Sequence, residues 1–370
     1  MSRDDERPIV EALSRARVSR PEYGSFPAMA PQRPTQKTIA EATGLTQATV
    51  SMALAGHPKI SAETRQLVLD TAERLGYRPD PVLSALSAYR KQIVPAGYQA
   101  TLAWLSNEGE DPRWKQSSTF RLYHSGALKR AQELGYNLEE HYLLSEGMTP
   151  RRLAELLQAR NIPGMLIAPQ PAPDMHIDFD FTHFSAVTFG YTLSRPALHL
   201  ATLHQFRSMK KLLANLIERG YKRPGLALGE DSDRRADYNW SGAYMSFQRH
   251  LPSSDHVPVH MPELLEQPAF TRWFKQHRPD VVVSINRHVH AWLTEAGERI
   301  PETTGVALLS VPDGGEFYSG IWENPELIGA RALEFLVDLI HRRECGVPTI
   351  PLSQLVDGTW VEGTTLRLPR

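Results

Sequence analysis

The segment 46–56, TQATVSMALAG, concentrates side chains that could contact the edges of DNA bases. Glutamine can form hydrogen bonds with adenine, and alanine, threonine or methionine can touch the methyl group of thymine. The short polar and apolar side chains available for such contacts are Gln47, Ala48, Thr49, Ser51 and Met52. If this segment is a helix, they form a candidate surface for reading base pairs.

A second set of candidate groups follows short apolar runs further along the chain. In doubly wound α/β domains, ligands bind at the carboxyl ends of the strands. The polar residues that follow such runs are Asn107, Gln170, Tyr191, Asp231, Asn286 and Asp313. The aromatic residues that could supply flat faces for a sugar ring are Trp114, Phe120, Trp240 and Trp322. Each aromatic residue could instead belong to the core or to the rim of the site.

The sequence offers no constellation of residues for catalysis or metal binding. His288 and His290 are two residues apart, so on a helix they point in different directions, and no third ligand is evident. There is no phosphate-binding glycine loop and no nucleophile elbow. Cys345 has no base partner in its surroundings. We therefore expect neither an enzyme, nor a metal site, nor a cofactor.

Three helices could position the candidate base-reading segment. Thr35, Thr46 and Ser61 have the character of N-caps and predict helices at 36–43, 47–55 and 62–75. Gly44 allows only a tight turn between the first two helices. A small core is expected from Ile39, Leu45, Val50, Leu54, Leu67, Val68 and Leu75. In DNA-binding proteins, this arrangement places the second helix in the major groove. The alternative is a helical hairpin that does not bind DNA.

The segments on either side of this helical unit have patterns that predict other structures. Residues 1–33 show no sustained period and predict a disordered extension. Asp80 and Pro81 predict the start of a short helix that ends near residue 87. Pro95 and Gly97 mark a linker, so we place the helical unit at 34–79 and a short helix with its linker at 80–97.

From residue 98 onward, apolar runs alternate with helical patterns. Strand-like runs occur at 101–105, 164–169, 186–190, 225–229, 281–285 and 306–310. Helical patterns occur at 120–134, 151–160, 206–219, 240–251, 270–277 and 325–340. Such alternation predicts parallel sheets covered by helices on both faces. A helix, a Gly-Tyr pair and a strand recur at 127–140 and 212–228, which favours two similar halves with a cleft between them.

Residues 39–81 resemble the N-terminal headpiece of the lactose-repressor/galactose-repressor family of bacterial transcription regulators. The positions that carry the resemblance are Ile39-Ala40, Gly44-Leu45-Thr46, Thr49-Val50-Ser51, Leu54 and Leu75-Gly76-Tyr77-Arg78-Pro79. Segments 297–313 and 324–340 are similar more loosely. The resemblance implies a small all-α helix-turn-helix headpiece followed by a two-lobed periplasmic-binding-protein-like domain with two doubly wound parallel sheets. Its lobes would comprise 98–222 with 325–351, and 223–324 with 352–370.

The resemblance also implies roles for single residues. The base-reading residues of the family fall on Gln47, Ala48 and Met52. Contacts to phosphates, or orientation of the helix, fall on Thr35, Thr46, Thr49, Ser51 and Tyr77, with Lys59 and Arg65 as basic candidates nearby. Leu86 lies where a hinge helix of the family inserts a leucine into the minor groove. Leu83, one turn earlier, could contact DNA or the hinge helix of a second subunit.

The chain departs from the family pattern at several informative places. Met52 stands where an arginine is common, so we expect a different preferred base pair at that position. Asn286-Arg287 stands where the family often has an asparagine followed by an aspartate. An effector with a carboxylate or phosphate would suit Arg287. A further sugar-binding position falls on Asn239 or Trp240, with Arg235 displaced upstream.

Composition limits the classes of protein to which the chain can belong. The chain has 370 residues, a net charge of −1 and one cysteine, and no apolar stretch approaches the length that spans a membrane. Its start lacks the pattern of a secretory signal. We expect a cytoplasmic homodimer that represses transcription at a near-palindromic operator on double-stranded DNA. Its small-molecule effector would be a sugar or sugar derivative, acidic ones included. The alternatives are a solute-binding protein of the periplasmic type and an α/β enzyme with a regulatory domain.

Overall fold

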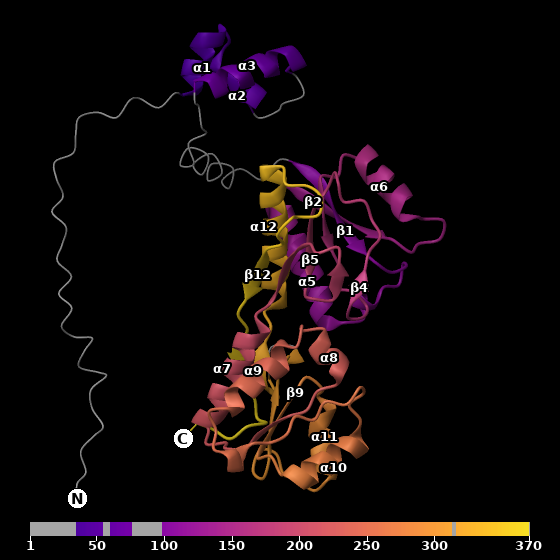
Figure 1. Cartoon of the computed structure of the whole chain (residues 1–370), viewed down its shortest axis with the longest axis vertical. Coiled ribbons are helices and arrows are strands. Elements are labelled where there is room, and N and C mark those ends of the chain that lie inside the picture. Colours follow the sequence, from indigo (N-terminus) through magenta and orange to yellow (C-terminus); the bar gives the residue numbers. More distant parts are fainter. Residues whose placement is uncertain (1–34, 55–59, 76–97, 313–315, 370) are drawn as a thin grey trace, which may run out of the picture. The chain divides into compact units, whose positions relative to one another are not determined.

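The computed structural model describes residues 35–54, 60–75, 98–312 and 316–369. The chain divides into two compact units, residues 1–90 and 91–370 (Figure 1). The expected disordered extension, the whole hinge-and-linker segment (80–97) and the sites at Lys59, Tyr77, Leu83, Leu86 and Asp313 lie outside the described residues.

Three capped helices form the described part of the first unit: α1 (Gln36–Thr43), α2 (Gln47–Leu54) and α3 (Ala62–Arg74). The Thr35 hydroxyl accepts a hydrogen bond from the backbone nitrogen of Thr38 (3.3 Å), and the Ser61 hydroxyl accepts one from Thr64 (3.2 Å). Gly44 ends α1 in the left-handed region (φ 70°), which glycine adopts without strain. The three predicted helices are therefore present, and their ends lie within one residue of the predicted ends.

The core of this unit matches the sequence prediction except at Leu67. Its buried side chains are Ile39, Ala40, Val50, Ala53, Val68 and Ala72, with Leu45, Leu54, Ile60 and Leu75 packed around them. Leu67, which we expected inside, is 49% exposed. The inward stripe of α3 runs through Val68, Ala72 and Leu75, and Leu67 lies outside that stripe.

The second unit contains two sheets. The first has six parallel strands in the order β12-β7-β5-β3-β1-β2. The strands are β1 (Ala100–Ser106), β2 (Tyr136–Tyr142), β3 (Gly164–Ile167), β5 (Ser185–Phe189), β7 (His199–Leu203) and β12 (Ser353–Val356). Its helical elements are η1 (Arg113–Lys115), α5 (Ser118–Glu133), α6 (Pro150–Ala159) and α12 (Pro325–Arg342). A small ribbon pairs β4 (Met175–His176) with β6 (Leu193–Arg195).

The second sheet has the order β13-β11-β10-β9-β8. Its strands are β8 (Pro224–Leu226), β9 (Val281–Ser284), β10 (Gly305–Leu308), β11 (Ser319–Trp322) and β13 (Thr359–Val361), of which only β13 is antiparallel to its neighbour. Its helices are α7 (Gln205–Glu218), α8 (Glu230–Arg234), α9 (Asn239–Gln248), α10 (Gln267–His277) and α11 (His288–Glu295), with η2 (Ser253–Asp255). The α/β fold with two parallel sheets is as expected.

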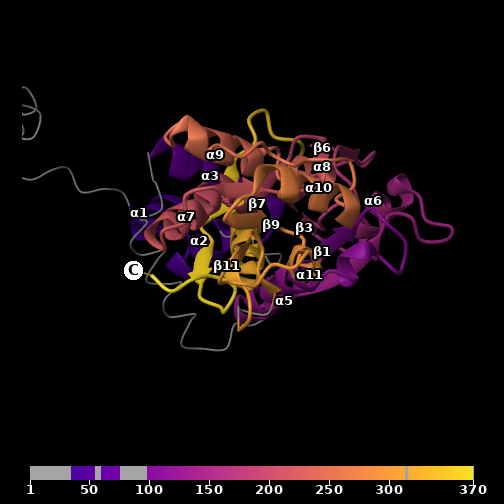
Figure 2. The same ribbon diagram turned by 90° about the horizontal axis from the view of Figure 1, so that it is seen from below.

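The chain crosses between the two lobes at places that differ from the predicted boundaries. Helix α7, expected in the first lobe, lies beside α9 and touches β11 and β13 of the second sheet (Figure 1 and Figure 2). Strand β12, expected in the second lobe, pairs with β7 of the first sheet. The first crossing therefore falls near residue 204 instead of 222, and the last near residue 357 instead of 351. Strand pairing decides this, and β12 is a half-exposed edge strand that gives little hydrophobic signal.

Helices α5 and α12 meet backbone to backbone. A Cβ atom on Gly329 would lie 2.0 Å from the backbone oxygen of Tyr123, and one on Gly126 would lie 2.0 Å from that of Glu326. Two glycines thus allow a separation that no other residue would permit. This contact holds Tyr123 of α5 near the start of α12, which begins two residues after Glu323.

Among the described residues, none of the helices has the length and hydropathy required to cross a membrane.

Replacing Gly329 with alanine tests this helix contact. We expect Gly329→Ala to lower the free energy of unfolding by about 1–3 kcal/mol because the added methyl group meets backbone that cannot retreat. Thermal and urea unfolding measure the effect. Gly242→Ala on α9 is the control, since its methyl group would meet nothing within 4 Å and should stabilise the helix by up to about 1 kcal/mol. Equal stability of the two variants would contradict the contact.

Candidate DNA-reading surface and ligand cleft

Helix α2 presents a polar surface to solvent. Gln47, Ala48 and Ser51 are exposed and Met52 is 36% exposed, whereas Val50 and Ala53 are buried in the small core. Thr49 is half-buried at the edge of this surface. The helix carries no ionisable side chain, so hydrogen bonds and methyl contacts are the interactions that its outer face can make.

The candidate phosphate-contacting residues lie near the helix starts. Thr35 and Thr46 are exposed and precede α1 and α2. The Thr46 hydroxyl accepts a hydrogen bond from the backbone nitrogen of Thr49 (3.1 Å), and the two hydroxyl oxygens lie 2.8 Å apart. Arg65 is half-buried on α3. Thr46 and Thr49 therefore serve as a cap for α2 in addition to any contact they make.

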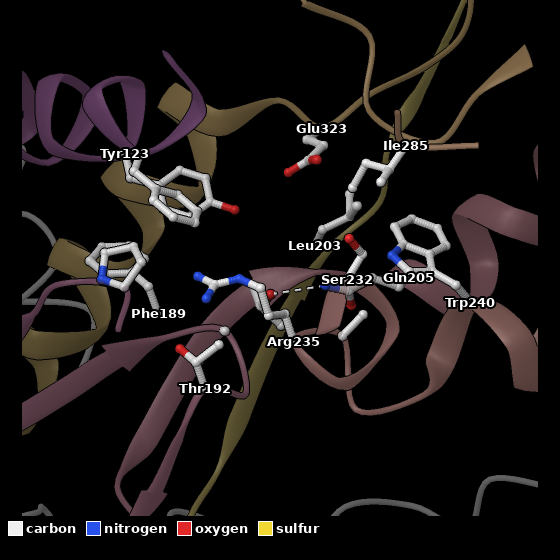
Figure 3. Close-up of a pocket in the computed structure, with 15 residues that line it drawn as sticks. Tyr123, Phe189, Thr192, Leu203, Gln205, Ser232, Arg235, Trp240, Ile285 and Glu323 are labelled. Atoms are coloured by element: carbon white, nitrogen blue, oxygen red, sulfur yellow. Dashed lines mark hydrogen bonds between the residues drawn. The ribbon is translucent and has the colours of Figure 1, made fainter. Parts of the chain in front are cut away.

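The second unit contains a cavity of about 280 Å³ that is lined by residues of both lobes. Its walls combine aromatic rings with hydroxyl, amide and charged groups (Figure 3). Its lining includes Phe120, Tyr123, Gln205, Arg235, Trp240 and Glu323. We call this space the first cavity.

The structure brings some of the predicted ligand residues to this cavity and leaves others away from it. Phe120 and Trp240 line it. Gln170 is buried behind the wall, where its side-chain oxygen accepts a hydrogen bond from Asn107 (3.1 Å). The described candidates that line neither this cavity nor the second one described below are Asn107, Trp114, Gln170, Tyr191, Asp231, Asn239 and Trp322.

Three of these misplaced residues have clear structural roles. Trp114 packs in the core with its ring 5.3 Å from that of Trp104. Asp231 is exposed and accepts a hydrogen bond from Arg234 (3.3 Å). Asn239 donates to the backbone oxygen of Ala236 (2.8 Å). Neither the location of a residue after a strand nor its aromatic character was enough to predict that its side chain faces the ligand cavity.

Arg235 is a central group of the first cavity that sequence reasoning did not include among the site residues. It directly follows α8, and its Nη2 donates to the backbone oxygen of Gln170 (2.9 Å) while Nη1 donates to that of Pro171 (3.3 Å). Its guanidinium carbon lies 5.7 Å from the centre of the Phe120 ring. Burial lowers the pKa of Arg235, yet a guanidinium remains charged in proteins. The protein thus holds a fixed positive charge in the cavity wall.

Glu323 and Tyr123 were also missed. Both side chains point toward the space that Arg235 enters (Figure 3). Burial raises the pKa of the Glu323 carboxyl, and hydrogen bonds with the Ser310 and Tyr123 hydroxyls oppose that rise. Burial and the neighbouring Glu323 raise the pKa of Tyr123 well above its ordinary value. Glu323 follows β11, so the strand-end rule could have found it; Tyr123 lies one helical turn after Phe120.

A second cavity, of about 330 Å³, adjoins the first through Ile285, which lines both. It contains the predicted pair Asn286 and Arg287. Its other lining residues are Ser118, Thr119, His288, Leu308, Ser310 and Pro312. The Asn286 side-chain oxygen accepts a hydrogen bond from the backbone nitrogen of His288 (2.9 Å), so Asn286 orients the start of α11.

Within the described parts of the chain, no cluster of three or more histidine, cysteine, aspartate or glutamate side chains could hold a metal ion.

Glu323→Gln provides a test of the buried carboxyl. Because the folded state raises the pKa of Glu323 above its ordinary value of 4.5, the neutral form favours folding below that pH, and this stability is lost as the pH rises through the raised pKa. We expect the melting temperature of the native protein to fall relative to that of Glu323→Gln across this window. Calorimetry at stepped pH, with exposed Glu263→Gln as control, measures it. A difference that stays constant with pH would contradict the burial.

The headpiece segment matches known transcription regulators. Residues 35–80 match the family model described as bacterial regulatory proteins, lacI family. Over 51 residues the chain is 47% identical to the HTH-type transcriptional regulator AglR of Rhizobium meliloti (strain 1021). That match covers 14% of this chain and 14% of the relative, so the sequence likeness to AglR is confined to one short segment.

The remainder of the chain has the fold of solved regulators. The structure titled transcriptional regulator CelR–cellobiose complex has a TM-score of 0.50 at 17% identity, covering 90% of this chain and 100% of that one. The Lac repressor dimer bound to operator and the anti-inducer ONPF has a TM-score of 0.50 at 16% identity, covering 91% and 100%. At such identities the likeness concerns the fold. Together the comparisons show a headpiece of the lacI family at residues 35–80 and, beyond it, a fold like that of these two solved regulators.

Proposed function

We propose that this chain is a sequence-specific transcription regulator, a repressor that acts as a cytoplasmic homodimer. Each headpiece would place α2 in the major groove of one half of a near-palindromic operator on double-stranded DNA. A small molecule, a sugar or sugar derivative, would bind in the cleft and change the affinity for DNA. The chain would carry out no catalysis.

The observation that carries the DNA-binding role is the exposed outer face of α2. Gln47, Ala48, Ser51 and Met52 face solvent while the opposite face of the helix is buried. Such a side chain set suits direct contact with base edges. A dimer is supported by affinity arithmetic, because one helix of eight residues contacts few base pairs and two linked half-sites multiply their weak affinities.

The effector role rests on the chemistry of the first cavity. Phe120 and Trp240 offer apolar faces, while Arg235, Glu323 and Gln205 offer hydrogen-bonding groups, a mixture that suits hydroxylated rings. Residues of both lobes line the cavity, so a ligand would favour one angle between the lobes. Coupling of this kind is reciprocal: operator DNA and effector would change each other's affinity by the same factor. CelR with cellobiose and the Lac repressor with ONPF show ligands in proteins of this fold.

The alternative is a solute-binding protein of the periplasmic type, which would share the two-lobed architecture. Binding of a solute between two lobes does not require three capped helices with a polar outer face on the second helix. The headpiece therefore favours the regulator.

Gln47→Ala is the test of the DNA-binding role. Selection of bound fragments from the source genome first identifies the operator, and titration with labelled operator then gives the dissociation constant. We expect at least about fivefold weaker binding, since each bidentate contact with a base is worth about 1–3 kcal/mol. Gln158→Ala, an exposed glutamine on α6, is the control and should bind as the native chain does.

Two outcomes would contradict the proposed function. If Gln47→Ala and Gln158→Ala both retain native affinity and selectivity for the operator, α2 does not read the DNA. Failure of the native chain to enrich any genomic sequence would remove the regulator function altogether.

A further inference from the structure

We propose that the second cavity is a subsite for an anionic group, so that the effector is a sugar that carries a phosphate or a carboxylate. This inference rests on the proposed function, because it concerns the ligand of the same cleft. It is supported by the position of the second cavity, which is lined by the cationic Arg287, next to the first cavity, whose aromatic side chains suit a sugar ring.

The charge of the second cavity favours an anion. Arg287 is the charged side chain in its wall, His288 lies beside it, and none of the described lining residues is an aspartate or glutamate. Other arginines near the cleft are engaged with protein acceptors: Arg234 pairs with Asp174 (2.5 Å), and Arg235 donates to backbone oxygens. Among the described residues, Arg287 forms no salt bridge. Its guanidinium is exposed and can bind a phosphate or carboxylate in the bidentate manner.

Hydroxyl groups and helix starts add to this charge. Ser118 and Thr119 are the first two residues of α5, and His288 is the first residue of α11. The N-terminal end of a helix carries a partial positive charge, which adds favourable interaction with an anion held nearby. The serine and threonine hydroxyls can donate hydrogen bonds to its oxygens. These groups reinforce the guanidinium and would not define a site without it.

The two cavities are joined closely enough for one ligand to use both. Ile285 lines both, and Ser310 of the second cavity has its hydroxyl within hydrogen-bonding reach of Glu323 of the first. A ring between Phe120 and Trp240 would meet Glu323, whose acceptor oxygens suit ring hydroxyls. A charged substituent on that ring would lie toward Ser310 and Arg287. The first cavity is less suited to an anion, because Glu323 faces it and two donors of Arg235 are already used.

The test measures binding to the full-length protein by calorimetry. The probes are glucose, galactose and fructose, their 6-phosphates, and glucuronate and galacturonate. We expect one acidic sugar to bind at least about tenfold more tightly than its parent hexose. In Arg287→Gln that affinity should fall by about 10- to 100-fold, the usual range for loss of a charge-assisted contact, while affinity for the parent hexose stays unchanged. A 6-phosphate preference and a uronate preference distinguish the two anion sources.

Two further variants keep the result interpretable. Arg287→Lys retains the charge without the bidentate geometry and should give an intermediate affinity. Arg249→Gln removes a charge from an exposed position at the end of α9 that lines neither cavity, and should bind as the native chain does. Thermal unfolding of each variant separates lost binding from lost folding.

Two outcomes would overturn the inference, and they are distinguishable. If a neutral hexose binds as tightly as its acidic derivatives and releases operator DNA, with no change in Arg287→Gln, the anion subsite is wrong and the proposed function stands. If no sugar of either class binds or alters operator affinity, the inference and the effector part of the proposed function fail together.

Discussion

The burial of Val50 and Ala53 decides which side of α2 faces solvent. Both side chains belong to a small core with Ile39 of α1 and Val68 of α3. A helix that buries one stripe must expose the opposite one, and the Gly44 turn and the Thr46 cap leave little freedom in how α2 begins. The outward position of Gln47 therefore follows from packing of apolar residues that would never touch DNA. The proposed reading of base pairs depends on that packing.

In the second unit, close helix packing has a comparable consequence for the cleft. The glycine contact between α5 and α12 brings Tyr123 close to Glu323, and these two residues with Arg235 give the first cavity its polar character. Burying a carboxyl is costly unless it is paired or neutral, which accounts for its raised pKa. Polar groups held in this way are available to a ligand without rearrangement, so the wall of the cavity is organised before a ligand arrives.

The headpiece could be predicted from sequence because its signals are local. Caps at Thr35, Thr46 and Ser61 and the turn at Gly44 lie within a few residues of what they determine, and the alternation of strands and helices gave the α/β class. The cleft could not be predicted as well, because residues distant in sequence create it. Sequence reasoning placed Trp114 in the site and left Arg235 out of it, yet Trp114 packs in the core and Arg235 lines the cavity wall.

The central claim is that the outer face of α2 contacts base edges, and a change of specificity tests it most directly. Arginine can bind guanine bidentately where methionine cannot, so Met52→Arg should alter which base pair is preferred at one position. Selection from random DNA with the native and variant full-length chains measures this. The account predicts that one base pair changes to G·C, at symmetric positions in both half-sites, while the others stay the same. An identical consensus for the two proteins, or no consensus for either, would contradict it.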